Sequence, residues 1–273
     1  MTQPSDNQLE LGFLLDAIFQ KYHYDFRSYS EASLQRRLIA AQTQLGFETL
    51  SRLQDRVLHD PATFAELLRF LTVQVSDLFR DPSYYRSIRE KVVPYLRTYP
   101  SPKIWVAGCA TGEEAYSLAI LLAEEGLLER TLIYATDINP ASLRAAEAGI
   151  YDIERFARFS ESYLSAGGKA SLSDYYTARY SSGVLDRALK KSILFSDHSL
   201  ATDSAFAEVE LVSCRNVLIY FQRELQDRAL GVFRDSLCRR GFLGLGYKES
   251  LRFSAHAAAF VDFVSQDRIY QRV

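Results

Sequence analysis

A glycine-containing segment followed by two glutamates is the feature of this sequence best suited to hold a ligand. Gly108 and Gly112 enclose the residues CAT in GCATGEE, and Glu113 and Glu114 follow at once. Glycines let the backbone pass close to a ligand at the carboxyl end of a strand. Two carboxylates at a helix start would repel a pyrophosphate but suit a cationic group, such as the ammonium of an amino acid. The alternative is that both glutamates only complement the helix dipole.

A second carboxylate position closes the next predicted strand. Asp137 lies in YATDIN, where a carboxylate can accept both hydroxyl groups of a ribose. The alternative is that Asp137 caps the helix introduced by Asn139 and Pro140. Together, the glycine segment, the glutamates and Asp137 favour a nucleoside with a positively charged amino-acid end. S-adenosylmethionine fits this description.

Composition and charge argue against several classes of protein. The 273 residues carry 32 Lys and Arg against 34 Asp and Glu, so a strongly basic nucleic-acid-binding protein is not indicated. The three cysteines form no CxxC pair and the four histidines show no ligand spacing, which predicts a reducing compartment and no metal site. The N-terminal residues lack a signal-peptide pattern and the apolar runs are short, so we expect a cytoplasmic protein without membrane insertion.

Hydrophobic periodicity divides the chain into two parts. Residues 1–80 predict an N-terminal helical domain, because apolar residues recur at helical spacing. Helices are expected over residues 11–22, 30–46, 49–57 and 61–72. Residues 81–102 predict a linker, because Pro94, Pro100 and Pro102 lie close together there.

Residues 103–273 alternate between strand and helix patterns, which predicts an α/β fold with a mostly parallel sheet and helices on both faces. The last two strands, in DFVSQ and RIYQRV, are expected to give an antiparallel edge. A helix is expected over residues 224–241, stopped by Gly241. Residues 151–195 break the alternation and predict an inserted small antiparallel β subdomain. Its expected strands are YYTARY and KSILFS, with a short helix near VLDRALKK.

Six blocks of the sequence resemble the chemotaxis receptor methyltransferases, which use S-adenosylmethionine to esterify glutamates on bacterial chemoreceptors. They are SYSEASLQRRL, VSDLFRDP, WVAGCATGEEAYSLAI, ATDIN, SCRNVLIYF and GYKESL. The blocks follow the order of the family and span nearly the whole chain. The resemblance implies a class I methyltransferase-like (Rossmann-like) fold, with S-adenosylmethionine as cofactor and S-adenosylhomocysteine as product.

The resemblance also assigns residues to the cofactor. The implied contacts are Gln74, Ser76, Arg80 and Glu114 at the amino-acid end, Asp137 at the ribose, Ser199 and Leu200 at the adenine, and Arg215 and Asn216 along the floor. Tyr220 matches a tyrosine near the transferred methyl, and we take Arg80 and Tyr220 as the catalytic residues that fix the geometry. The alternatives are an ion pair with Asp81 for Arg80 and core packing for Tyr220.

The sequence departs from the family pattern at several positions. Gln74, Ser76 and Ser199 replace the more usual Asn, Thr and Asn. In GYKESL, Tyr247 and Lys248 replace a His and a Ser. The first three keep polar chemistry with a different reach, and the last two are expected to alter the rim on the substrate side.

The implied reaction requires no strong general base from the protein. A glutamate with a pKa of about 4.3 is already ionised at neutral pH, so alignment and partial desolvation are the main tasks. The implied partner is the cytoplasmic helical region of a chemoreceptor or related signalling protein, with no nucleic acid, and we expect a monomer. Basic residues on the predicted helices are either solvated or form a docking face; they are Arg36, Arg37, Arg52, Arg56 and Arg69.

Two other functions remain open. The chain could be a non-catalytic regulatory module that binds S-adenosylmethionine, or a methyltransferase that acts on a different carboxylate. In some family members the small subdomain holds a receptor-tail peptide, and the sequence does not decide whether residues 151–195 do so.

Overall fold

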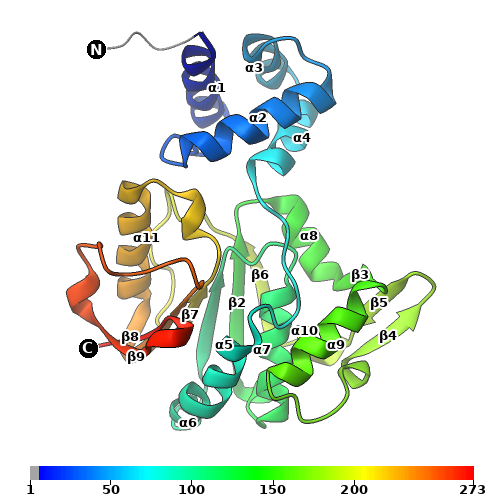
Figure 1. Ribbon diagram of the computed structural model, residues 1–273, viewed down its shortest axis with the longest axis vertical. Helices are drawn as coiled ribbons and strands as arrows, with labels where there is room; N and C mark the ends of the chain where they lie inside the picture. Colours follow the sequence, from blue (N-terminus) through cyan, green and yellow to red (C-terminus); the bar gives the residue numbers. More distant parts are fainter. Residues whose placement is uncertain (1–5) are drawn as a thin grey trace. The chain divides into compact units, whose positions relative to one another are not determined.

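The computed structural model describes residues 6–273, which form two compact units (Figure 1). The first unit contains the chain up to Val73, together with Ser199–Asp203 and Tyr220–Ala229. The second contains Gln74–His198, Ser204–Ile219 and Leu230–Val273. The first stretch of chain therefore ends at Val73, whereas the sequence placed the division at residue 80.

Four helices build the first unit. They are α1 (Asp6–Tyr22), α2 (Glu31–Leu45), α3 (Leu50–His59) and α4 (Pro61–Leu71). Leucines and other apolar side chains at helical spacing are buried between them, as Leu14, Leu38 and Leu53 show at 0% exposure. Gly46 ends α2 in the left-handed region, and the Thr49 side chain caps α3. The four predicted helices of this part are confirmed.

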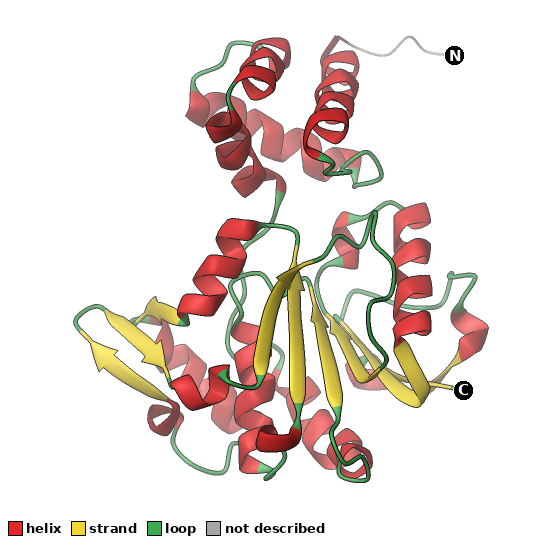
Figure 2. Cartoon of the chain, turned by 180° about the vertical axis from the view of Figure 1, so that it is seen from behind, coloured by secondary structure: helices red, strands yellow, loops and turns green. Residues whose placement is uncertain are grey.

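A seven-stranded sheet forms the centre of the second unit (Figure 2). Its order is β6-β2-β1-β7-β8-β10-β9. The strands are β1 (Lys103–Ala107), β2 (Leu132–Asp137), β6 (Ile193–Asp197), β7 (Val209–Cys214), β8 (Leu237–Leu245), β9 (Phe260–Val264) and β10 (Ile269–Arg272). Pairings from β6 to β8 are parallel, and β10 is antiparallel to both β8 and β9. The predicted parallel sheet with an antiparallel end is confirmed.

Helices connect and cover these strands (Figures 1 and 2). The longer ones are α7 (Glu113–Glu124), α8 (Pro140–Ala148) and α11 (Arg223–Ser236), and the 3₁₀ turns are η2 (Leu128–Arg130), η4 (Leu218–Tyr220), η5 (Ala257–Ala259) and η6 (Ser265–Asp267). Residues 81–102, predicted as a linker, form α5 (Pro82–Ser87), the π-helical turn η1 (Ile88–Val92) and α6 (Val93–Leu96). Their apolar side chains, including Tyr85 and Leu96, belong to the main core.

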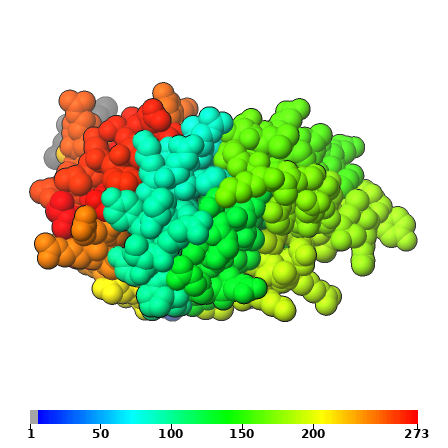
Figure 3. Space-filling model, turned by 90° about the horizontal axis from the view of Figure 1, so that it is seen from below, coloured from blue at the N-terminus to red at the C-terminus, as the bar shows by residue number. Residues whose placement is uncertain are grey.

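The insertion contains a separate antiparallel sheet of order β3-β5-β4. Its elements are β3 (Ile150–Asp152), α9 (Arg155–Ser165), η3 (Leu172–Tyr175), β4 (Tyr176–Arg179), β5 (Ser182–Leu185) and α10 (Arg187–Lys190). In Figure 3 this green to yellow-green segment projects from one side of the second unit. The antiparallel subdomain is confirmed.

Two details of the insertion differ from the prediction. KSILFS is not a strand of the small sheet, because β6 pairs in parallel with β2 through Ile133 and Ile193 in the main sheet. The strand that pairs with β4 is instead β5, from SGVL. The sequence analysis also overlooked α9, although Phe156, Phe159 and Tyr163 are buried at helical spacing.

The predicted helix over residues 224–241 is too long. Helix α11 ends at Ser236, and β8 begins at Leu237, which pairs with Val209 of β7. This pairing is a long-range contact that overrides the local helical pattern. A Cβ at Gly241 would lie 2.9 Å from the carbonyl oxygen of Cys238, so the glycine allows the strand to turn tightly rather than ending a helix.

Among the helices of residues 6–273, none combines the length and the apolar character needed to cross a membrane.

Candidate active site

Asp137 joins the turns that follow the first two strands. Its carboxylate accepts hydrogen bonds from the backbone N–H groups of Ala110 and Asn139, each at 2.9 Å. Burial raises the pKa of Asp137. The cap of α8 is Asn139, whose side-chain oxygen accepts from Ala141 N–H at 2.8 Å. The alternative that Asp137 itself caps this helix is therefore wrong.

The two glycines of GCATGEE are required by the protein's own packing. Gly108 and Gly112 have φ of 73° and 95°, in the left-handed region that glycine tolerates. A Cβ at Gly108 would lie 2.5 Å from Val217 Cγ2, and one at Gly112 would lie 2.8 Å from the Cβ of Ala146. Neighbouring side chains therefore already require glycine at both positions, and the close approach of a ligand to this backbone stays a prediction.

Glu113 and Glu114 have different surroundings. Glu113 is fully buried, accepts a hydrogen bond from Thr111 Oγ1 at 2.7 Å and pairs with Arg155 at 2.8 Å. Burial raises the pKa of Glu113, and these two partners oppose the rise. Glu114 accepts from Ser213 Oγ at 2.6 Å and keeps 13% of its side chain exposed. Of the two, Glu114 is thus the carboxylate that remains accessible to a ligand.

Arg215 connects Glu114 to the turn that carries Arg80. Its Nη2 donates to Asp81 Oδ2 at 2.6 Å and to the carbonyl oxygen of Arg80 at 3.1 Å, and its Nη1 lies 3.5 Å from Glu114. The Arg215 side chain is 2% exposed and lies over the ring of Tyr84. Arg215 therefore holds two other predicted site residues in place.

The turn around Arg80 is strained and presents the arginine to solvent. Phe79 and Asp81 have φ of 54° and 57°, which non-glycine residues rarely adopt. Asp81 is engaged by Arg215, so the alternative of an Arg80–Asp81 ion pair is wrong. Within residues 6–273, the exposed side chain of Arg80 has no hydrogen-bond or ion-pair partner.

Gln74 and Ser76 precede this turn on the same loop. Gln74 Nε2 is buried and has no hydrogen-bond partner among the described residues. The carbonyl oxygen of Ser76 accepts a hydrogen bond from Arg155, and the Asp77 side chain pairs with Arg155 at 3.2 Å. The loop therefore offers unsatisfied N–H donors on a backbone that Arg155 fixes.

Tyr220, Ser199 and Leu200 belong to the first unit. The carbonyl oxygen of Tyr220 accepts from the Ser30 backbone N–H at 2.8 Å. The Tyr220 ring is half-buried, and the guanidinium carbon of Arg37 lies 4.5 Å from its centroid. Tyr220 therefore does not occupy an apolar core position, which was the alternative. Ser199 begins a short turn, in which its N–H donates to Asp203 at 2.9 Å, and Leu200 is buried.

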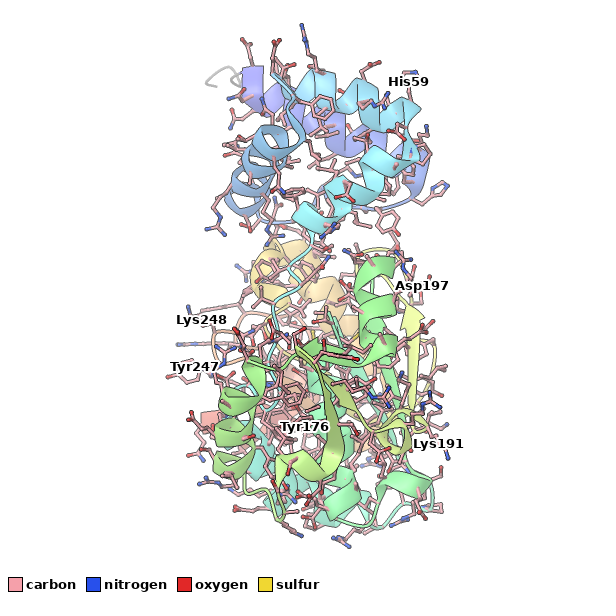
Figure 4. The ribbon with its side chains drawn as sticks, turned by 90° about the vertical axis from the view of Figure 1, so that its right-hand side faces the viewer. His59, Tyr176, Lys191, Asp197, Tyr247 and Lys248 are labelled. Atoms are coloured by element: carbon pink, nitrogen blue, oxygen red, sulfur yellow. The ribbon has the colours of Figure 1, made fainter. Side chains whose placement is uncertain are left out.

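Asn216 follows β7 with φ of 61°. Its backbone N–H donates to the carboxylate of Glu249 at 3.0 Å. The sequence analysis gave Glu249 no role, although the residue lies in the block GYKESL, and it likewise overlooked Arg155. Tyr247 and Lys248, the substituted residues of that block, are exposed and project away from the protein (Figure 4).

The thiol of Cys109, in the glycine segment, is buried. Burial, and to a smaller extent the negative charges of Asp137, Glu114 and Glu113, raises the pKa of this thiol well above its ordinary value. All three cysteines are buried and free. Within the described part of the chain, no group of three His, Cys, Asp or Glu side chains could hold a metal ion.

Comparison with known proteins decides the family. Residues 74–266 match the family described as CheR methyltransferase, SAM binding domain, and residues 9–72 match its all-alpha domain. The chain belongs to the CheR methyltransferase family. The mostly parallel sheet with its covering helices is accordingly the class I methyltransferase-like, Rossmann-like fold that the sequence predicted.

Two relatives of this CheR methyltransferase align with it over most of their length. A Pseudomonas putida protein named "Putative methyltransferase Cher3" is 54% identical over 272 residues, covering 100% of both chains. A chemotaxis protein methyltransferase of Listeria monocytogenes is 30% identical and covers 83% of this chain and 84% of its own. Among solved structures, the glycopeptide N-methyltransferase MtfA complexed with sinefungin has a TM-score of 0.38 and 10% identity, covering 63% of this chain and 50% of that one.

The groups on the second unit of this CheR methyltransferase suit S-adenosylmethionine. The unpaired donors of Gln74 and Arg80 suit a carboxylate, and the accessible oxygens of Glu114 suit an ammonium. Asp137 retains acceptor capacity beyond the two backbone N–H groups it already binds. The residues present therefore fit the cofactor that the family's domain binds.

Proposed function

We propose that this CheR methyltransferase transfers the methyl group of S-adenosylmethionine to glutamate side chains of a chemoreceptor-type protein. The products are a glutamate methyl ester and S-adenosylhomocysteine. The observation that carries the proposal is the exposed, unpartnered Arg80 on a strained turn, held by Arg215 next to Glu114. An exposed cation and a carboxylate that stays partly accessible beside Ser213 and Arg215 match the two charges at the zwitterionic end of the cofactor.

Each predicted residue then has a task in binding. Gln74 and Arg80 donate to the methionine carboxylate, and Glu114 accepts from the ammonium. Asp137 accepts from the ribose, Ser199 and Leu200 contact the adenine, and Arg215 and Asn216 shape the floor. Ser76 contributes its side-chain hydroxyl at the amino-acid end, since its carbonyl oxygen is already bound by Arg155.

The sulfonium of the bound cofactor supplies an electrophilic methyl, and the acceptor carboxylate attacks it in line. With a pKa of about 4.3, the acceptor needs no general base at neutral pH. Opposite charges are neutralised as the bond forms, so partial exclusion of water lowers the barrier. Arg80 fixes the cofactor through its methionine end, and Tyr220 aligns the methyl with the acceptor.

The proposed partner is the cytoplasmic helical region of the receptor. The helical domain docks on it through exposed basic side chains such as Arg36 and Arg52. The Listeria relative, named a chemotaxis protein methyltransferase, supports this choice of partner.

The test has two stages. Calorimetry with S-adenosylmethionine and S-adenosylhomocysteine should show binding that Arg80→Ala weakens by tenfold or more. Tritiated methyl transfer to receptor cytoplasmic fragments should then give a label that mild alkali releases as methanol, as an ester requires. Fragments with the acceptor glutamates changed to alanine serve as the control. Binding without transfer to any carboxylate would instead indicate a regulatory module, and an alkali-stable label would exclude an ester.

A further inference from the structure

Glu249 is a buried carboxylate in a segment whose other side chains point outward. The segment GYKES follows β8 directly, and Tyr247 is 72% exposed whereas Glu249 is 4% exposed. Figure 4 shows Tyr247 and Lys248 extending away from the protein. The inward direction of Glu249 therefore needs a specific explanation.

Backbone N–H groups surround this carboxylate. Glu249 accepts from Gly246 at 2.6 Å, from Asn216 at 3.0 Å and from Ile219 at 3.3 Å. Within the described chain no Lys, Arg or His side chain forms an ion pair with it. Burial raises the pKa of Glu249, and the backbone donors oppose part of that rise. The carboxylate is thus held by main-chain dipoles rather than by a countercharge.

These bonds join two turns at the carboxyl end of the sheet. Gly246 follows β8, whereas Asn216 and Ile219 lie in the segment that follows β7. That segment begins with Arg215, whose contacts hold Asp81 and the carbonyl oxygen of Arg80. Asn216 adopts a φ of 61°, in the left-handed region that asparagine visits more readily than most non-glycine residues.

The space between the two turns is fully used. A Cβ added at Gly246 would lie 2.6 Å from Glu249 Oε2 and 2.7 Å from the backbone nitrogen of Asn216. Because Gly246 has no side chain, the Glu249 carboxylate can contact the Asn216 backbone. A substitution at either Glu249 or Gly246 should disturb this contact.

We propose that Glu249 is a positioning residue for S-adenosylmethionine: by fixing the main chain from Asn216 to Ile219, it sets the floor on which the cofactor binds. This role rests on the proposed function, because it takes Arg215 and Asn216 as cofactor contacts. Glu249 itself acts through these residues and touches neither substrate.

Two variants test the role from opposite sides. Glu249→Gln keeps the size of the side chain but replaces one acceptor oxygen with an NH₂ group, which cannot accept from the backbone. Gly246→Ala keeps the carboxylate and inserts a methyl into the contact. Both should raise the Kd for S-adenosylmethionine by calorimetry about tenfold or more. Lys248→Ala and Ser250→Ala, at exposed neighbours, should stay within twofold of the wild type.

A second measurement separates positioning from general loss of structure. Hydrogen exchange at the amides of Asn216 and Ile219 should speed up in Glu249→Gln, while the amides of the first-unit helices exchange at the wild-type rate. If Glu249→Gln does not fold, Gly246→Ala provides both measurements. Wild-type affinity in both variants would overturn the role and leave the proposed function standing. A wild type that fails to bind S-adenosylmethionine would overturn the proposed function itself.

Discussion

The guanidinium of Arg37 lies over the ring of Tyr220, 4.5 Å from its centroid. Arg37 also donates to the carbonyl oxygen of Leu71 at 2.6 Å, and burial lowers the pKa of its guanidinium. Its Nη2 is buried without a hydrogen-bond partner among the described residues. Arg37 is therefore a support for the predicted catalytic tyrosine, rather than one of the solvated basic residues among which the sequence analysis counted it.

Replacing Arg37 should slow methyl transfer without changing cofactor affinity. Arg37→Ala removes a partly buried cation–π contact of about 1–2 kcal/mol, so we expect kcat to fall roughly tenfold. The measurement is tritiated methyl transfer at saturating receptor fragment, with calorimetry for the Kd of S-adenosylmethionine. Arg239→Ala, at an exposed arginine outside the proposed docking face, is the control. An unchanged kcat in Arg37→Ala would show that Arg37 does not support Tyr220 in methyl transfer.

Charge reversal of exposed arginines on the helical domain should weaken receptor docking. Arg36 is exposed, and Arg52 is 67% exposed, with Glu48 as its partner. Arg36→Glu and Arg52→Glu should raise the KM for receptor fragments several-fold, more at low salt than at high salt, because exposed charges are screened. The affinity for S-adenosylmethionine should not change.

Arg239→Glu, an exposed position in the second unit, controls for the change in net charge. Arg37 is left out of this set because its contacts are internal. Equal loss of receptor methylation in all three variants, or a matching loss of cofactor affinity, would contradict docking through α2 and α3.

The sequence predicted the boundaries of those helices and strands that are marked by residues next to them in the chain. Strand β2 ends at Asp137 and Gly46 caps α2, so turn and cap residues mark both boundaries. The start of β8 at Leu237 could not be predicted in this way, because it depends on pairing with Val209. The same holds for β6, whose place in the main sheet is decided by its distant partner β2.

The sequence predicted which residues form the candidate site, but not which side chains contact one another there. Adjacent glutamates look alike in sequence, but Arg155 binds Glu113 while Glu114 faces Ser213. The partners lie on elements far along the chain, and no local pattern specifies such a pairing. For the same reason, Glu249 received no role until its backbone donors were known.

Removing Arg155 should make stability more sensitive to pH. Burial raises the pKa of Glu113 above its usual value, so its contribution to stability is fully present below about pH 4.5 and is lost as pH rises through its folded pKa. Arg155 opposes this rise. In Arg155→Met the pKa of Glu113 should climb further, and each added unit costs about 1.4 kcal/mol above that pKa.

The measurement is the free energy of unfolding by denaturant at pH 5, 6.5 and 8. We expect Arg155→Met to lose about 3 kcal/mol relative to the wild type at pH 8, because a buried carboxylate is left unpaired, and clearly less at pH 5. The double variant Arg155→Met/Glu113→Gln should show no such pH dependence. Parallel pH curves for the wild type and Arg155→Met would show that Glu113 has another source of stabilisation.

Alanine substitutions at Gly108 and Gly126 should distinguish two destabilising effects: the strain of a left-handed backbone and the steric overlap of an added Cβ. Both have positive φ, 73° and 66°, but a Cβ at Gly126 meets nothing within 4 Å, whereas one at Gly108 lies 2.5 Å from Val217 Cγ2. Gly126→Ala should therefore cost only about 1 kcal/mol for the left-handed backbone. Gly108→Ala should cost about 3 kcal/mol, since steric overlap adds to the same term. Unfolding in denaturant measures both, and Val217→Ala in the Gly108→Ala background should recover part of the difference. Equal losses for the two alanine variants would mean that the turn after β1 shifts freely, and that its position is not fixed by Val217.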